Sequence, residues 1–508
     1  MGSSTVECVR RVARARLRRG MRGRMWLGMA VAAVVATLAL VVAPVIQAAQ
    51  AAPSRNPVGP LLLQSNSQWP AYLQNISRSG FNSTESQISP SSAASLKQRW
   101  AYATTMPVSA EPVEANNLVY VGSWDGNERA LTTGGQVVWT TFIGQTSDSA
   151  CDPTLAGVAS TPFVTQVSPA NLLQRRSMLY VGGGDGQIYA LDALKGTIAW
   201  KTRLGPSPAT FIWSSPLAYG GSVYIGVASL GDCPLVQGQM VKLNATTGAV
   251  QHVFDVVPNG CTGGGVWSSP TLDVATGLIY FDTGNDGGCS TSEPYSTAVV
   301  ALHASDLSLA SSWQIPPAQQ IPDGDFGSTP TLFTATIGGV ARSLVGAVAK
   351  SGIYYAFDRA NVGAGPVWMT RIAVGGDCPQ CGDAAIGPTA WDGQTLYAAA
   401  GATTINGKSC AGSIQALDPA TGAPRWQTCL AAAVLGAVTA VPGVVFVGVG
   451  ITFSAFAASS GAVLFSFTDT HSQPFWGAAS VADGSVYVGN MDGTLFRFAP
   501  GPAALPPV

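Results

Sequence analysis

The chain has 508 residues, with 26 basic and 27 acidic side chains and a formal net charge of −1. This balance argues against a nucleic-acid partner, because phosphate binding needs clustered Lys and Arg. Beyond the first fifty residues no apolar run approaches the roughly 20 residues that a membrane-spanning helix needs, which excludes a multi-span membrane protein.

The N-terminus has the pattern of an export signal. Residues 1–25 carry eight arginines, residues 26–46 are apolar and uncharged, and the small residues Ala49 and Ala51 follow. This order predicts a secreted or extracytoplasmic protein, in the periplasm or on the cell surface. Because the apolar run is about long enough to span a bilayer, an uncleaved anchor is the alternative, and it would be the only membrane contact. Without residues 1–51 the formal charge is 18 − 26, or −8.

Eight cysteines remain after the signal, and an even number in an exported chain indicates up to four disulfides. The Cys378-Pro379-Gln380-Cys381 stretch is followed by glycine and not histidine, so it is not a haem c attachment site. From nearness along the chain we expect these pairs: Cys378–Cys381, Cys410–Cys429, Cys233–Cys261 and, by remainder, Cys151–Cys289.

A repeated unit fills the rest of the chain. Each unit opens with small residues that lead into a short strand, continues with two more apolar strands around glycine-rich turns, and closes with an aromatic residue. The clear openings are Ala159–Pro162, Trp213–Pro216, Trp267–Pro270 and Gly327–Pro330, and looser ones lie at 386–388, 435–437 and 476–478. The closing aromatics are Trp100, Trp139, Trp200, Phe254, Trp313, Trp368, Trp426 and Phe465.

These units predict an all-β, eight-bladed β-propeller of four-stranded antiparallel blades, because a lone four-stranded sheet cannot bury both of its faces. The last unit stops after its third strand, so we expect Leu96–Thr104 to supply the missing outer strand and close the ring. The expected organisation is an export signal at 1–52, an N-terminal extension at 53–93, the propeller at 94–499 and a Pro/Ala-rich tail at 500–508.

The stretch Ala416–Gly422 followed by Trp426 reads ALDxxTGxxxW and resembles the repeat signature of quinoprotein-type propellers. Trp69–Tyr72 and the residues up to Leu96 also resemble the start of polyvinyl-alcohol-dehydrogenase-like members. The resemblance covers about residues 68–499. It implies a dehydrogenase that oxidises a small or polymeric alcohol with pyrroloquinoline quinone (PQQ) and calcium in the propeller funnel. It includes no haem domain, so electrons would pass to a separate acceptor. Other relatives bind no quinone, and the alternative is a binding or scaffold module comparable to the propeller lipoproteins of outer-membrane assembly.

The resemblance also implies roles for single residues. Trp267 would support the flat face of the quinone, and Asn285, after Thr283-Gly284, would bind calcium. Asp323 or Asp325 would be the catalytic base, with the spacing to the next basic residue favouring Asp323. That basic residue, Lys350, would contact the quinone oxygens. The alternatives are a blade-packing tryptophan, two exposed turns and a solvated lysine.

Two positions depart from the family pattern. The dehydrogenases have two adjacent cysteines over the quinone, where this chain has only Cys151, and a disulfide from Cys151 to Cys289 is expected to cover the cavity instead. The calcium-binding glutamate is also missing; Asp232 lies beside that position, next to Cys233, and is the substitute ligand that the sequence offers.

Overall fold

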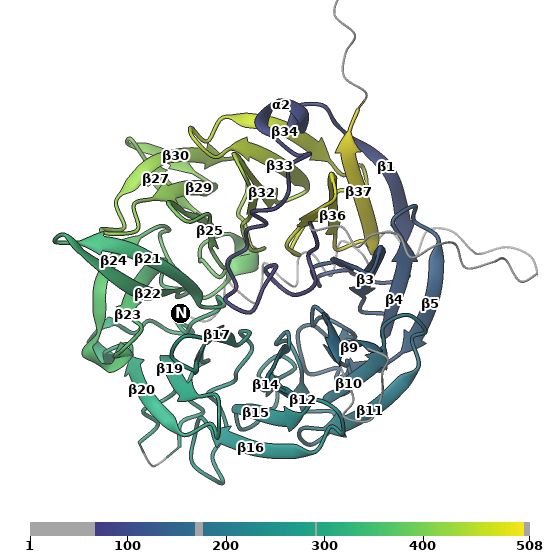
Figure 1. The fold of residues 1–508 in the computed structure, drawn as a ribbon. Helices are drawn as coiled ribbons and strands as arrows, with labels where there is room; N and C mark the ends of the chain where they lie inside the picture. The colour runs from purple at the N-terminus through teal and green to yellow at the C-terminus, as the bar shows by residue number, and fades with distance from the viewer. Residues whose placement is uncertain (1–66, 168–175, 290–291, 502–508) are drawn as a thin grey trace, which may run out of the picture. The chain divides into compact units, whose positions relative to one another are not determined.

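The computed structural model describes residues 67–167, 176–289 and 292–501, so the predicted export signal lies outside the described part. Within the compact unit Ser65–Val508, eight four-stranded antiparallel sheets are arranged as a ring of blades (Figure 1). This confirms the predicted eight-bladed propeller. Among the described residues, no helix combines the length and the apolar character needed to cross a membrane.

In each of the first four blades the strands follow one another from the innermost to the outermost. Blade 1 contains β2 (Val113–Ala115), β3 (Leu118–Gly122), β4 (Asn127–Thr132) and β5 (Val137–Phe142); blade 2 contains β8 (Phe163–Val167), β9 (Arg176–Gly182), β10 (Gln187–Asp192) and β11 (Ile198–Arg203); blade 3 contains β13 (Leu217–Tyr219), β14 (Ser222–Ser229), β15 (Gln239–Asn244) and β16 (Val250–Asp255); blade 4 contains β17 (Thr271–Asp273), β18 (Leu278–Asp282), β19 (Ala298–His303) and β20 (Leu309–Gln314).

The other four blades follow the same plan, except that the outer strand of blade 8 comes from the N-terminal side of the chain. Blade 5 contains β21 (Thr331–Ile337), β22 (Val340–Val348), β23 (Ile353–Asp358) and β24 (Pro366–Arg371); blade 6 contains β25 (Ala390–Trp391), β26 (Leu396–Ala400), β29 (Gly412–Leu417) and β30 (Pro424–Leu430); blade 7 contains β31 (Thr439–Val441), β32 (Val444–Val449), β33 (Thr452–Ala457) and β34 (Val463–Thr468); blade 8 contains β35 (Ser480–Ala482), β36 (Ser485–Gly489), β37 (Thr494–Pro500) and β1 (Leu96–Ala103).

The remaining elements are short and lie in the connections between these strands. They are α2 (Pro90–Ala93), β6 (Thr146–Ser147), β7 (Leu155–Ala156), β12 (Thr210–Phe211), β27 (Thr403–Ile405), β28 (Lys408–Cys410), η1 (Pro317–Gln319), η2 (Val362–Ala364) and η3 (Pro379–Cys381).

Strand β1 closes the ring as predicted. It pairs antiparallel with β37, so that Ala101 lies opposite Phe496, and the two ends of the propeller share one sheet (Figure 1). Hydrogen bonds along β1 and β37 replace a covalent connection between blade 8 and the N-terminal side of the chain.

The closing tryptophans explain the repeat signature. Trp139 at the outer strand of blade 1 donates from Nε1 to the Ala193 carbonyl in the last turn of blade 2, at 2.9 Å. Gly196 in that turn lies under the indole, and a Cβ there would be 2.5 Å from the ring. An indole placed in this way therefore needs a turn carbonyl and a glycine in the next blade. The same pair of contacts is made by Trp200, Trp368 and Trp426 with Gly248, Gly422 and Gly461.

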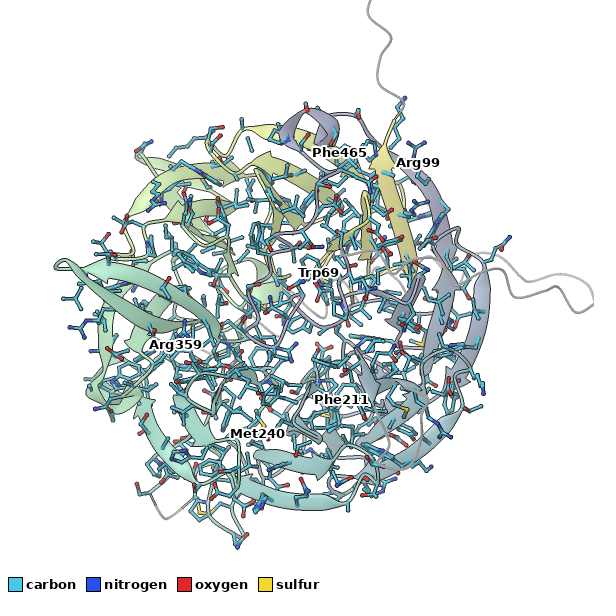
Figure 2. The ribbon with its side chains drawn as sticks, in the orientation of Figure 1. Trp69, Arg99, Phe211, Met240, Arg359 and Phe465 are labelled. Carbon is cyan, nitrogen blue, oxygen red and sulfur yellow. A yellow bond between two sulfur atoms is a disulfide. The ribbon has the colours of Figure 1, made fainter. Side chains whose placement is uncertain are left out.

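The N-terminal segment 67–88 runs through the centre of the ring (Figure 1). Its backbone bonds to innermost strands of several blades, for example from Val164 to the Pro70 carbonyl at 2.8 Å and from Ala440 to the Gly80 carbonyl at 2.7 Å. Trp69, labelled in Figure 2, has no exposed surface and pairs with blade 1. Because an innermost strand is a sheet edge with unpaired groups, this segment satisfies donors that would otherwise face the channel.

Arg78 is the basic residue of that segment. It has no exposed surface and donates to the carbonyls of Tyr72 at 2.7 Å, Pro216 at 3.0 Å and Pro270 at 3.0 Å. Burial lowers the pKa of Arg78 to about 10. A single guanidinium thus joins the N-terminal segment to the innermost strands of blades 3 and 4.

Two of the four expected disulfides are confirmed and two are wrong. Cys378–Cys381 and Cys410–Cys429 form as expected. Nearness along the chain failed for the others, because the ring brings loops of different blades to one place. Cys151, between blades 1 and 2, pairs with Cys233 of blade 3 across 82 positions, with Cα atoms 5.4 Å apart, and the remaining pair is Cys261–Cys289.

Candidate functional site

The candidate site lies where two kinds of loop meet. In an antiparallel blade, the loop before the innermost strand and the loop between the second and third strands lie on the same face. Trp267 precedes β17 and Asp325 precedes β21, while Asn285 follows β18 and Lys350 follows β22. The predicted residues therefore come from equivalent loops of blades 4 and 5 and share one face.

The glycine-rich turn before Trp267 lets three backbone segments pass closely. Gly264 donates to the Asn285 carbonyl at 2.6 Å, and Gly263 and Gly264 have φ angles of 102° and 62°, which favour glycine. A Cβ on Gly238 would lie 1.8 Å from the Gly264 carbonyl oxygen, and one on Gly287 would lie 1.9 Å from the Thr262 carbonyl oxygen. The turn thus fixes Asn285 beside the start of the Trp267 strand.

Lys350 is held between two carboxylates. Its Nζ lies 2.9 Å from Oδ1 of Asp323 and 2.7 Å from Oδ1 of Asp325, and the Lys350 backbone N–H donates to the Asp325 carbonyl at 2.9 Å. The same Nζ is 5.4 Å from the centre of the Trp267 ring. Trp267 in turn donates from Nε1 to Oδ2 of Asp325 at 3.2 Å. Four predicted residues therefore form one connected cluster.

The environments of the two aspartates differ. The Asp325 side chain is 4% exposed, and burial raises its pKa to about 6, with Lys350 opposing the shift and Asp323 adding to it. The Asp323 side chain is 40% exposed and has a φ of 50°. Burial alone would lower the pKa of Lys350, but Asp325 and then Asp323 raise it above its ordinary value. Lys350 stays charged, Asp325 titrates near neutrality, and Asp323 faces the open side.

Oxygen ligands gather on that open side. Asn285 donates from its amide to Oδ1 of Asp323 at 2.5 Å, which places its amide beside the carboxylate. Asp232, although its side chain is exposed, lies within electrostatic range of Asp323 and Lys350: desolvation by nearby atoms raises its pKa, Asp323 adds to the rise and Lys350 opposes it. Asp232, Asp323 and Asp325 thus outnumber the one ammonium group, an excess of negative charge that favours a bound cation.

Trp267 belongs to a ring of eight equivalent positions, which we call the mouth ring. Each member lies four residues before the start of an innermost strand and is partly exposed, while both of its neighbours in sequence are buried or nearly so. Next to Trp267 the ring holds Gly327, whose Cβ would lie 2.4 Å from Cη2 of the indole. The indole therefore extends over the place that a side chain at 327 would occupy. The members are Ser109, Ala159, Trp213, Trp267, Gly327, Ile386, Leu435 and Trp476.

Cys151 lies outside this set of direct contacts. Its disulfide to Cys233 packs in an adjoining apolar cluster with Trp124, Phe211 and Trp213, and Figure 2 labels Phe211. Because Cys233 directly follows Asp232, the disulfide borders the acidic side of the site. It does so from blade 3, and the expected bond from Cys151 to Cys289 in blade 4 is not formed.

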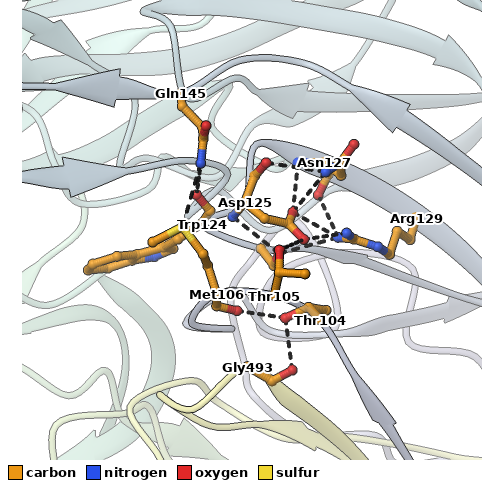
Figure 3. Close-up of polar contacts among 10 residues, drawn as sticks. Thr104, Thr105, Met106, Trp124, Asp125, Asn127, Arg129, Gln145 and Gly493 are labelled. Carbon is orange, nitrogen blue, oxygen red and sulfur yellow. Dashed lines mark hydrogen bonds and ion pairs between the residues drawn. The ribbon is translucent and has the colours of Figure 1, made fainter. Parts of the chain in front are cut away.

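A polar network in blade 1 supports the same face, and the sequence did not single it out (Figure 3). Asp125 and Arg129 form an ion pair beside Trp124 and hold the loop between β3 and β4. Burial alone would raise the pKa of Asp125, but hydrogen bonds from Arg129, Ser123 and Asn127 lower it below its ordinary value. The ion pair is local, since both residues come from one loop and strand. An acidic and a basic residue four positions apart are common on protein surfaces, so the sequence alone does not distinguish this pair.

Asp282 is a buried acid that the sequence analysis also missed. It is fully buried at the end of β18, and its Oδ1 has no hydrogen-bond partner among the described residues. Burial raises its pKa well above the ordinary value, and Asp325 contributes to the rise. Burial thus favours the neutral form of the Asp282 carboxyl, and Asp325 lies close enough to add to that effect. The sequence signal that could have identified Asp282 is the stretch LIYFDTGN, in which an acidic residue ends an otherwise apolar strand.

Comparisons with known proteins bear on the family and the fold of the chain. A family model described as the β-propeller domain of glucose/ethanol/alcohol dehydrogenases matches residues 69–371, and one described as outer membrane protein assembly factor BamB matches residues 410–501. A polyvinylalcohol dehydrogenase from Pseudomonas sp. is 26% identical over 491 residues, covering 86% of this chain and 72% of that relative. The chain spans only 46–54% of the length of the other curated relatives reported.

Solved structures show the same fold. The quinohemoprotein alcohol dehydrogenase from Comamonas testosteroni has a TM-score of 0.66 at 20% identity, covering 87% of this chain and 82% of that one. A europium-containing methanol dehydrogenase has a TM-score of 0.67 at 15% identity, covering 85% and 98%. At these identities the likeness establishes the propeller and leaves the chemistry to the site residues.

Proposed function

The chain belongs to the family of the glucose/ethanol/alcohol dehydrogenase β-propeller domain, and we propose that it oxidises an alcohol with PQQ and an oxygen-bound metal ion at the blade 4–5 site. The observation that carries the proposal is the connected cluster of Trp267, Asp323, Asp325 and Lys350. It combines an aromatic face, a cation and a carboxylate that titrates near neutrality, which a blade-packing tryptophan and solvated turns would not need.

The residues of the site fit both PQQ and an oxygen-bound metal ion. Trp267 offers a partly exposed indole, fixed through its Nε1 to Asp325, on which a flat ring can stack. Asn285 and Asp323 offer an amide and a carboxylate side by side, and Asp232 adds a second carboxylate within electrostatic range. Calcium prefers such oxygen ligands. The missing glutamate of the family pattern is thus offset by Asp232.

The choice of metal belongs to the test. Calcium is the metal we propose, but one structural relative is a europium-containing methanol dehydrogenase. Both ions favour oxygen ligands, and three carboxylates against one ammonium group give the site enough negative charge for either.

We propose Asp325 as the group that accepts the alcohol proton. With a pKa of about 6, the Asp325 carboxyl is mostly ionised at neutral pH. This pKa is closer to neutral than that of an ordinary carboxyl, which makes Asp325 a stronger general base. Lys350 would orient this carboxylate through its 2.7 Å ion pair, and Asp323 would then serve the metal with Asn285. PQQ, when bound, supplies the acceptor for the hydride. This assignment reverses the preference for Asp323 that spacing alone suggested.

The finer properties follow the relatives. Polyvinyl alcohol is the first substrate to test, since the Pseudomonas relative whose alignment covers 86% of this chain is named for it. We further propose that the protein works outside the cytoplasm and passes electrons to a separate acceptor, since Cys378 and Cys381 form a disulfide and lack the histidine of a haem attachment site.

The test is reconstitution. Residues 53–508, expressed under oxidising conditions, are mixed with PQQ and either calcium or europium, and quinone absorbance and dye reduction are followed with polyvinyl alcohol, small alcohols and sugars. We expect saturable binding that a chelator abolishes, and a kcat/KM that rises with pH, is half-maximal near pH 6 and levels off above it. Asp325→Asn should lower kcat by at least a hundredfold with quinone binding retained. The matched control is Asp286→Asn, because Asp286 is exposed and adjoins Asn285.

A second function is favoured by one observation. The model of outer membrane protein assembly factor BamB matches residues 410–501, which include blade 7, three of the four strands of blade 8 and two of the four strands of blade 6. A quinone-free propeller would then bind a protein or glycan on its rim. Failure to bind PQQ at micromolar concentration with either metal would refute the dehydrogenase and leave this function.

A further inference from the structure

A second group of metal-ligating side chains lies on the same face, far along the chain from the proposed alcohol site. Asp469 and His471 lie in the loop after β34 of blade 7, and Asp492 lies in the loop between β36 and β37 of blade 8. We call these three residues the blade 7–8 cluster. It belongs to the loops next to the closure of the ring, and it shares no residue with blades 4 and 5.

The positions of the three side chains suit a shared metal ion better than a single hydrogen bond from His471. Nδ1 of His471 lies 3.1 Å from Oδ2 of Asp492 and 3.5 Å from Oδ1 of Asp469, and all candidate ligand atoms lie within 4.8 Å of one another. A single Nδ1–H cannot point well at two carboxylates. An ion about 2.0–2.2 Å from each ligand atom would place those atoms roughly 3–3.5 Å apart, and both distances from Nδ1 of His471 fall in this range.

Burial supplies an independent observation. The Asp469 side chain is 3% exposed, yet among the described residues the side-chain contacts of its two oxygens are long: Oδ1 lies 3.5 Å from Nδ1 of His471, and Oδ2 accepts a bond from the Gln473 N–H at 3.5 Å. A buried carboxylate without strong partners is costly. A cation at the blade 7–8 cluster would remove that cost.

The other two ligands are held ready. Asp492 accepts a bond from the Thr494 N–H at 2.9 Å through Oδ1, which leaves Oδ2 facing His471. The two loops are joined by a backbone bond from Met491 to the Pro474 carbonyl at 2.9 Å. His471 is 72% exposed, so the remaining coordination positions would be open to water.

We propose that Asp469, His471 and Asp492 bind one divalent transition-metal ion of the zinc, nickel or copper class. An imidazole nitrogen with two carboxylates suits these ions, whereas calcium takes six to eight oxygen ligands. The bound ion would link the loop after blade 7 to the loop that leads into β37, the strand whose pairing with β1 closes the ring. This site is independent of the proposed alcohol oxidation.

The test uses the oxidised protein without a histidine tag. Equilibrium dialysis against Zn²⁺ with elemental analysis should give one strongly retained equivalent, and Co²⁺ should give visible absorption typical of a low-coordinate site. His471→Ala should weaken Zn²⁺ binding at least tenfold and abolish the Co²⁺ bands, and Asp492→Asn should weaken binding similarly. His303→Ala is the matched control, because His303 is also exposed and lies near one carboxylate, Asp306.

Thermal unfolding gives a second readout. Excess Zn²⁺ should raise the Tm of the unsubstituted protein and the His303→Ala variant, and leave the His471→Ala variant unchanged. Equal Zn²⁺ affinity in the His471→Ala variant, or no retained equivalent in the unsubstituted protein, would overturn the proposal and leave His471 as an ion-pair partner of the two aspartates. His471 is exposed, so its substitution is not expected to prevent folding.

Discussion

Replacing Asp325 with asparagine should change how the stability of the protein depends on pH. Burial raises the pKa of Asp325 from 3.8 to about 6. A carboxyl whose pKa is higher in the folded state contributes stability below pH 3.8, and this contribution is lost as pH rises through 6. A difference of about 2.2 pKa units corresponds to about 3 kcal/mol. Because part of this contribution is already lost at pH 4, the unsubstituted protein should lose roughly 2–2.5 kcal/mol, relative to Asp325→Asn, between pH 4 and pH 7.

The assay is urea unfolding of both proteins, with disulfides intact, at half-unit steps from pH 4 to pH 7.5. Other titrating groups occur in both proteins, so the difference in the free energy of unfolding isolates Asp325. The asparagine can still accept the bond from Trp267, and Lys350 keeps its 2.9 Å ion pair with Asp323. A difference that stays constant within 1 kcal/mol across this range would refute the raised pKa, and with it the choice of Asp325 as base.

Three further predictions concern the framework around the site. Gly327→Ala places a Cβ 2.4 Å from the Trp267 indole, so it should cost about 1–3 kcal/mol in urea unfolding and alter the near-UV circular dichroism of tryptophan. Arg78→Met leaves buried carbonyls without donors and should cost about 2–4 kcal/mol in the same assay. Removing the Cys151–Cys233 disulfide with serines opens a loop of 82 residues and should cost about 4–5 kcal/mol in the chain-entropy model, measured as a lower urea midpoint.

Each of these variants has a matched control. Gly134→Ala adds a Cβ that lies 3.5 Å from Oγ1 of Thr132, an ordinary contact distance, so an equal effect at 134 and 327 would contradict the packing argument. Arg342 is 49% exposed, and Arg342→Met should change stability by less than about 1 kcal/mol. Serines at Cys378 and Cys381, which are three positions apart, should cost about 2 kcal/mol, and a cost equal to that of the 82-residue loop would contradict the entropic account.

The fold could be predicted because its stabilising contacts repeat. The signature around Ala416–Gly422 and Trp426 encodes an indole, a turn carbonyl and a glycine that meet between successive blades. Each copy carries the same information, so degenerate copies such as the one at Leu435–Ala437 could be placed by their neighbours. The missing outer strand of blade 8 followed from counting strands, and β1 fills it.

The disulfides could not be predicted in the same way, because they join loops, and the cysteines in those loops do not recur from blade to blade. Cys151 and Cys233 are 82 positions apart, but both lie in loops of one face, between blades 1 and 2 and within blade 3. An assignment by loop type would have put them on the same face, whereas nearness along the chain paired Cys233 with Cys261. The successes at Cys378–Cys381 and Cys410–Cys429 are contacts within one loop or blade.

The candidate site lies between these two cases. Its positions repeat, since the loops that carry Trp267, Asn285, Asp325 and Lys350 occur in every blade, and the sequence could therefore bring these residues together. Their division of roles does not repeat, because it depends on burial. Two aspartates only two residues apart differ tenfold in exposed side-chain fraction, 40% against 4%, and only the buried one contacts the indole. Spacing treats Asp323 and Asp325 as near equivalents; desolvation makes one a candidate base and leaves the other open to a metal.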